Sequence, residues 1–202
     1  MKEYPINFKT DMVAAILDGR KTMARRVIKP QPIEALYDLK QHSGIPDYWI
    51  PYAQDRRVIN NNIGNRKDDC GYYCPYGQAG TRLWVRETWA AMNLYDDFKP
   101  RDIPANSPIW YKGTDVDMPS GCGDDMGKVR SSRFMCKWMS RTLLGITNIR
   151  VERLNAMTES DAHAEGVESV LQFASLWDTI NKARGYSWDS NPWCWCISFR
   201  RI

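Results

Sequence analysis

The sequence lacks any long apolar run. No stretch of its 202 residues approaches the roughly 18 apolar residues of a membrane span, and residues 1–6 lack the apolar run of a secretory signal peptide. We therefore expect a cytoplasmic protein without a membrane partner. In that reducing compartment the six cysteines are expected to be thiols, and their irregular spacing is not that of a small disulfide-rich secreted fold.

The sequence also lacks the motifs of several large enzyme classes. It contains no Ser-His-Asp arrangement, no phosphate-binding loop and no dinucleotide fingerprint. Its two histidines, His42 and His163, have no evident partner, and His163 is expected to face solvent. The net charge of +4 and the pI of 8.7 fall short of the pI above about 9 that is typical of duplex-binding domains. This charge permits an anionic partner without requiring one, and we expect no cofactor.

No metal site is predicted, although the cysteines leave one alternative open. Four of them occupy loop positions from which they could bind a structural zinc ion. These are Cys70, Cys74, Cys122 and Cys136. Their spacing is not that of a common zinc ribbon or knuckle, so zinc remains the alternative rather than the prediction.

Three patterned blocks, residues 4–29, 81–90 and 134–202, are separated by stretches rich in Pro, Gly, Asp, Asn and Ser. We therefore expect a single domain spanning residues 1–202, with two long loop insertions at about 30–80 and 96–133. Loops of this length are uncommon unless they serve a function or are disordered. They are the part of the chain where we would expect a protein partner, if there is one.

The predicted core is mostly β. Residues 193–200 alternate strictly between apolar and other residues, which predicts a strand. A longer strand is expected over residues 141–153, with a change of apolar phase at Thr147 and Asn148. Thr158 begins a capping-box pattern for a short helix that Gly166 should end. A second helix carries an apolar stripe and should stop at Gly185. These elements together predict an α+β fold.

A basic octet, residues 19–26, follows a short amphipathic helix for which Thr10 is the expected N-cap and Gly19 the expected terminator. It gathers four cations in what we interpret as one turn. These are Arg20, Lys21, Arg25 and Arg26. A solvated basic turn is the simplest explanation of such a cluster. The alternative is a cationic site that faces acidic segments elsewhere in the chain.

Glu87 is one such acid. If Leu83 and Val85 point into the core, the period of two along a strand sends Glu87 inward as well. A buried carboxylate requires a cationic partner, because an unpaired one is costly to desolvate. The candidates are Lys21, Arg25, Arg26 and Arg141. Two interpretations stay open, an internal ion pair that stabilises the fold and a polar binding pocket.

These motifs occur in an order that resembles the ASCH domain family, and most closely the larger ASCH-like proteins of bacteriophages and prophages. The resemblance rests on Gly19-Arg20-Lys21-Thr22, Gly80-Thr81-Arg82-Leu83-Trp84-Val85-Arg86-Glu87, Ala164-Glu165-Gly166 and Asn191-Pro192-Trp193. It covers about two thirds of the chain. It implies a PUA-like, mostly antiparallel β-barrel with flanking short helices, and a cleft between the Lys21 turn and the helix carrying Glu165. The family is associated with binding RNA or modified nucleosides.

Some small members of that family are amidohydrolases of N4-acetylcytidine, and at least one relative is described as a ribonuclease. The resemblance places the Lys and Glu of the amidohydrolases at Lys21 and Glu165, which are our candidate catalytic residues. It places their Thr at Ala24, which has no hydroxyl to add to a carbonyl. Thr22 is displaced from that position by about 7 Å in an extended chain, too far to substitute directly. Hydrolysis by water, activated by Glu165 or Glu87 and assisted by Lys21, is the alternative function.

Binding does not need the missing hydroxyl, because cations can take a phosphate, a carboxylate can accept from an exocyclic amine, and an aromatic ring can stack on a base. We therefore expect a protein that binds RNA, another single-stranded nucleic acid or a modified nucleoside. The predicted ligand-binding residues are Lys21, Thr22, Arg25, Arg26, Trp84, Glu87, Trp138, Arg141 and Glu165.

Overall fold

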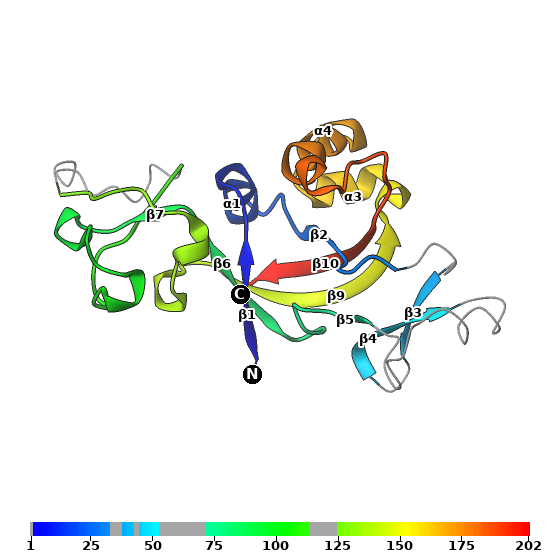
Figure 1. Ribbon diagram of the computed structural model, residues 1–202, viewed down its shortest axis with the longest axis horizontal. Coiled ribbons are helices and arrows are strands. Elements are labelled where there is room, and N and C mark those ends of the chain that lie inside the picture. Colours follow the sequence, from blue (N-terminus) through cyan, green and yellow to red (C-terminus); the bar gives the residue numbers. More distant parts are fainter. Residues whose placement is uncertain (1, 33–37, 43–44, 53–71, 114–124) are drawn as a thin grey trace. The chain divides into compact units, whose positions relative to one another are not determined.

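The computed structural model describes residues 2–32, 38–42, 45–52, 72–113 and 125–202. The chain divides into two compact units (Figure 1). Unit 1 consists of residues 1–21, 81–145 and 200–202, and unit 2 consists of residues 22–80 and 146–199. Strands β9 (Leu143–Arg153) and β10 (Trp193–Arg201) each contribute residues to both units.

Unit 1 begins with strand β1 (Glu3–Asn7) and helix α1 (Thr10–Leu17). The N-cap of α1 is Lys9, whose side chain makes no capping bond, and the predicted N-cap Thr10 is the first helical residue. Gly19 ends the helix as expected, since its φ of +76° lies in the left-handed region that favours glycine. β1 pairs in parallel with β6 (Arg82–Arg86), and β6 pairs antiparallel with the start of β9.

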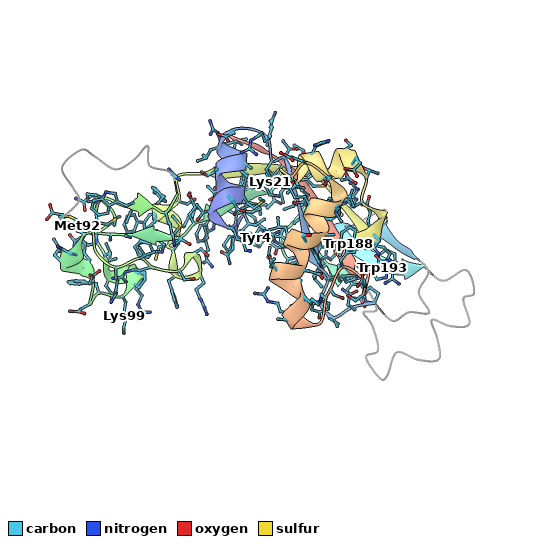
Figure 2. The ribbon with its side chains drawn as sticks, turned by 90° about the horizontal axis from the view of Figure 1, so that it is seen from above. Tyr4, Lys21, Met92, Lys99, Trp188 and Trp193 are labelled. Atoms are coloured by element: carbon cyan, nitrogen blue, oxygen red, sulfur yellow. The ribbon has the colours of Figure 1, made fainter. Side chains whose placement is uncertain are left out.

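The rest of unit 1 forms a small core of its own. Strands β7 (Trp89–Ala90) and β8 (Trp110–Tyr111) pair, and four short 3-10 helices surround them. These are η1 (Asn93–Tyr95), η2 (Pro100–Asp102), η4 (Ser132–Phe134) and η5 (Lys137–Met139). Met92 and Lys99, labelled in Figure 2, belong to this region. The core consists of Trp89, Ala91, Ile103, Met135 and Met139. The stretch predicted as a loop at 96–133 is thus partly ordered around buried side chains.

Unit 2 contains strand β2 (Met23–Val27), which pairs antiparallel with β10 so that Ala24 lies opposite Ile197. The predicted basic turn is therefore wrong for residues 23–26, because β10 offers a long-range partner that the local pattern does not reveal. Three further strands lie in the other predicted loop, β3 (Asp38–His42), β4 (Ile45–Tyr52) and β5 (Tyr72–Tyr73), and form an antiparallel sheet.

The helices of unit 2 match their predictions closely. After β9 and η6 (Leu154–Ala156), Thr158 caps α3 (Glu159–Ala164) in a capping box with Asp161. Helix α4 (Val170–Asn181) continues into η7 (Lys182–Arg184), and Gly185 ends it in the left-handed region. In Figure 1, α3 and α4 lie close to β10, and Cys194 of β10 packs in a core with Phe173 and Trp177 of α4. Both faces of β10 are therefore buried along Trp193–Ile197, not only the predicted apolar face.

The hydrogen-bonded order of the main sheet is β1-β6-β9-β10-β2, in which β1 pairs in parallel with β6, whereas β6 with β9 and β10 with β2 are antiparallel pairs. In the part of the chain that is described, this sheet is open, with β1 and β2 at its edges. The predicted closed barrel is therefore not formed, because the chain between these strands folds into α1 and its terminal turn instead of a pairing hairpin. The α+β class and the mostly antiparallel sheet are confirmed. The phase change in β9 is also confirmed, since Thr147 and Asn148 are both exposed between buried residues.

Two leucines of unit 2 provide a matched test of its core. Leu154 is completely buried beside α4, whereas Leu171 on α4 is 78% exposed. We predict that Leu154→Ala lowers the free energy of unfolding by about 2–5 kcal/mol, and that Leu171→Ala changes it by less than about 0.5 kcal/mol. Urea unfolding followed by circular dichroism measures both, and equal losses would contradict the described core.

Candidate functional site

Charged side chains are buried at four positions of the described structure. These are Lys21, Arg25, Glu87 and Glu165, and none of them is more than 4% exposed. All four belong to the ligand-binding residues predicted from the sequence. A solvated basic turn is therefore wrong for Lys21 and Arg25, although Thr22 is exposed and Arg26 is half-buried. Burying a charge is costly unless it is paired and hydrogen-bonded, so the surroundings of each residue define what it can do.

Arg25 lies on β2 with its side chain fully buried in unit 2. Its Nη2 donates to Asp161 Oδ2 at 3.0 Å and to Glu152 Oε2 at 3.2 Å. Its Nη1 lies 3.9 Å from Glu165 Oε1. Arg25 therefore faces three carboxylates from β9, α3 and the C-cap of α3. This pairing favours a role in positioning the acids, while its predicted contact with a ligand phosphate stays a prediction.

Asp161 connects this group to the helix cap. Its carboxylate accepts from the backbone N–H of Thr158 at 3.1 Å, and from Arg150 Nη2 at 2.6 Å through its other oxygen. Burial alone would raise the pKa of Asp161, but the hydrogen bonds from Thr158, Arg150 and Arg25 lower the pKa to about 2. Arg150 also pairs with Glu152. We call these five residues the Arg25 cluster, which comprises Arg25, Arg150, Glu152, Asp161 and Glu165.

Sequence reasoning missed three members of the Arg25 cluster as site residues. Arg150 and Glu152 are two apart on β9, so their side chains share one face of the strand and can join one network. This alternation of opposite charges within a strand was the signal available in the sequence. Asp161 was recognised only for its capping position, and its partner Arg25 is 136 residues away.

Glu165 is the C-cap of α3 and is 3% exposed. Immediately before it, the carbonyl of Ala164 accepts a hydrogen bond of 2.8 Å from the N–H of Thr22. The end of α3 and the start of β2 are therefore joined through their backbones. Glu165 thus lies at this junction, with Arg25 Nη1 3.9 Å from its carboxylate.

Lys21 follows α1 in unit 1 (Figure 2) and is buried there. Its backbone N–H donates to the carbonyl of Ala15 at 2.9 Å, and its ammonium lies 5.7 Å from the centroid of the Phe8 ring. A cation over an aromatic face is favourable when it is desolvated. Because Lys21 and Glu165 belong to different units, their convergence in one cleft stays a prediction.

Glu87 is buried after β6, as the strand period predicts. Its carboxylate accepts two hydrogen bonds from Arg141, at 2.8 Å from Nη2 and 3.1 Å from Nε. The Arg141 guanidinium also stacks 4.0 Å from the centroid of the Tyr111 ring. Arg141, one of the four cations proposed from the sequence, is thus a partner of Glu87. A bidentate pair of this kind gives geometric precision as well as energy.

The two predicted stacking residues have different environments within unit 1. Trp84 on β6 is 8% exposed, and the Arg86 guanidinium lies 4.6 Å from its ring centroid. Trp138 on η5 is partly buried against the core around Trp89. His163 on α3 is exposed, as expected.

The described thiols belong to no cluster of metal-ligating residues, and three of them are buried. Cys70 and Cys122 lie outside the described residues, and those that are described contain no group of three or more metal-ligating side chains. Burial raises the pKa of Cys194 to about 12 and the pKa of Cys196 well above its ordinary value. Both therefore remain protonated and unreactive at neutral pH.

Across the described residues, no helix has both the length and the apolar character needed to cross a membrane.

No family model matches this sequence, and no curated protein matches it significantly. Among solved structures, the chain is similar to a protein from Enterococcus faecalis assigned to the family DUF984. The identity is 11%, the match covers 100% of this chain and 80% of the other, and the TM-score is 0.41.

The low pKa of Asp161 predicts how stability depends on pH. A carboxyl whose pKa is lower in the folded state stabilises the fold above its unfolded pKa of about 3.9. That contribution is lost as the pH falls toward the folded pKa of about 2. We predict that Asp161→Asn lowers the free energy of unfolding by about 2–4 kcal/mol at pH 7, and that its difference from the wild type shrinks between pH 4 and 2.

Denaturant unfolding over this pH range measures the effect. Asp189→Asn is the matched control, because Asp189 is exposed. A gap between wild type and Asp161→Asn that stays constant down to pH 2 would contradict the assignment.

Proposed function

We propose that this protein binds RNA or a modified nucleoside, as an ASCH-like protein of the bacteriophage and prophage type, with Lys21 and Glu165 in the binding cleft. The observation that carries the proposal is the hydrogen bond from Thr22 to Ala164, because these residues are the chain neighbours of Lys21 and Glu165. Within unit 2 it joins the start of β2 to the end of α3, beside Glu165.

The charge of the Arg25 cluster favours a ligand that donates hydrogen bonds. Two guanidinium groups, of Arg25 and Arg150, face the three carboxylates of Glu152, Asp161 and Glu165. Glu165 is the carboxylate at greatest distance from Arg25, at 3.9 Å from Nη1. A carboxylate readily accepts from the exocyclic amine of cytosine or from a comparable N–H group. In this proposal Glu165 recognises the base, Lys21 contacts a carbonyl or phosphate, and Arg25 positions Glu165.

The environment of position 24 favours binding over covalent hydrolysis. Ala24 is completely buried on β2, opposite Ile197 of β10. The nucleophilic hydroxyl of the amidohydrolase relatives is therefore replaced by a methyl group in an apolar contact. Thr22 is exposed and its backbone joins α3 and β10 through its N–H and its carbonyl, so its position is set by these bonds.

Calorimetry with cytidine, N4-acetylcytidine and a short RNA tests this function. We predict that Glu165→Gln weakens binding of the preferred ligand about 10-fold or more, because an acceptor of a charge-assisted hydrogen bond is lost. Lys21→Ala should weaken it similarly. Chromatography of the mixtures should show N4-acetylcytidine intact.

Two exposed residues provide matched controls, Glu168→Gln and Lys182→Ala, and neither should change the affinity. Absence of binding to all three ligands by the wild type would refute the proposal. Release of acetate from N4-acetylcytidine would instead favour the hydrolase alternative.

A further inference from the structure

The positive charge of this protein belongs to unit 1. Unit 1 has sixteen Lys and Arg against eleven Asp and Glu, a net charge of +5, whereas unit 2 has twelve against thirteen, a net charge of −1. Within unit 1, residues 128–141 contain five cations and no acid. We call residues 128–141 the basic segment. An electropositive stretch of this kind attracts polyanions.

The basic segment is held rigidly by its buried residues. Met135 and Met139 are at most 2% exposed and pack in the core around Trp89. Arg130 has a structural role, because its guanidinium donates to the carbonyls of Tyr95, Asp96 and Phe98. The other side chains of the basic segment therefore project from a backbone that these buried residues hold in place.

Arg133 and Phe134 form an exposed basic and aromatic pair, and Lys137 is a further exposed cation of the segment. Phe134 on η4 is 56% exposed, and the Arg133 guanidinium lies 5.4 Å from the centroid of its ring. Lys137 on η5 has a side chain that is 63% exposed and pairs with Glu3 at 2.6 Å. Exposed aromatic rings beside cations are typical of surfaces on which single-stranded nucleic acids stack their bases and place their phosphates.

Lys137 also lines a hollow of about 340 Å³ in unit 1. The other polar or aromatic residues of its lining are Glu3, Trp84, Ser140, Arg141 and Thr142. The volume lies in the range of small-molecule sites, roughly 300–1,000 Å³. Its lining combines an indole, two cations, a carboxylate and two hydroxyls, which are the groups that a nucleotide requires for stacking, phosphate binding and hydrogen bonding.

A second observation indicates that this hollow is built for a ligand. Thr142 is 2% exposed, yet its hydroxyl has no hydrogen-bond partner among the described residues. A buried hydroxyl without a partner costs about 1–3 kcal/mol, and Thr142 is one of the residues that line the hollow. Ser140 in contrast satisfies its hydroxyl by donating to the carbonyl of Val85.

We propose that the basic segment and this hollow form a contact site for single-stranded nucleic acid, in which the hollow takes one nucleotide and Arg133, Phe134 and Lys137 hold its neighbour. This inference rests on the proposed nucleic-acid function and extends it to a surface of unit 1. The site lies on residues that the resemblance leaves unexplained, since most of the basic segment falls outside the matching motifs.

Fluorescence anisotropy with a labelled single-stranded 12-mer RNA over a series of salt concentrations tests this site. We predict that Arg133→Gln with Lys137→Gln lowers the affinity at least 10-fold and reduces the salt slope by about 1.4, because each lost phosphate contact removes about 0.7. Phe134→Ala should lower the affinity about 5-fold or more through lost stacking. These side chains are exposed, so the variants are expected to fold.

Matched controls come from unit 2, namely Lys182→Gln with Arg184→Gln for the charges and Leu171→Ala for the exposed apolar surface. They should leave the affinity unchanged. Ultraviolet crosslinking of 4-thiouridine RNA should label tryptic peptides 83–86, 134–137 or 138–141. Equal RNA affinity of the wild type and the Arg133, Phe134 and Lys137 variants would overturn the proposal, as would crosslinks confined to other peptides.

The outcomes separate this site from the proposed cleft. Nucleoside binding that depends on Glu165, without RNA binding to the basic segment, would refute this inference and leave the proposed function standing. RNA binding that depends on Arg133 and Phe134 but not on Glu165 or Lys21 would support this site and refute the cleft. Failure of the wild type to bind the 12-mer at any salt concentration would overturn the inference.

Discussion

The carboxylate of Asp161 is the constraint on which the candidate site in unit 2 depends. It caps α3 through Thr158, pairs with Arg25 on β2 and pairs with Arg150 on β9. Arg25 has no exposure to water, so moving α3 away from β2 would leave a buried guanidinium with fewer partners, at a cost of several kcal/mol. Helix α3 is thereby held in one position against the strands, and Glu165 at its end is held with it.

A partly buried network of five charged groups is a poor way to gain stability, because apolar residues of similar volume often stabilise a core as well or better. Its value lies in geometry and electrostatics. The network places the carboxylate of Glu165 at the point where the backbone joins the end of α3 to the start of β2. The pair of Glu87 and Arg141 has a comparable positioning role in unit 1. There the bidentate contact and the Tyr111 ring hold Arg141 at the lining of a hollow.

Local signals in the sequence predicted the local features of this structure. The capping box at Thr158, the stop at Gly185, the strand over residues 193–200 and the inward direction of Glu87 all follow from periodicity and capping within a few residues. Features that depend on distant partners were missed. The segment Met23–Val27 contains two arginines, and its local pattern resembles a basic turn. It forms a strand because β10, which is distant in the sequence, pairs with it. The open edge of the sheet and the Arg25 partners likewise depend on contacts between remote segments, which no single-sequence pattern specifies.

The most direct test of this account is a double-mutant cycle between Asp161 and Glu165, read out as nucleoside affinity by calorimetry. If Asp161 acts by positioning Glu165, Asp161→Asn weakens binding in the wild type but has little further effect in the Glu165→Gln background, so the two changes are strongly non-additive. Circular dichroism at the working temperature confirms that each variant is folded. Independent, additive losses, or unchanged affinity in folded Asp161→Asn, would contradict the claim that this charged network serves the ligand site.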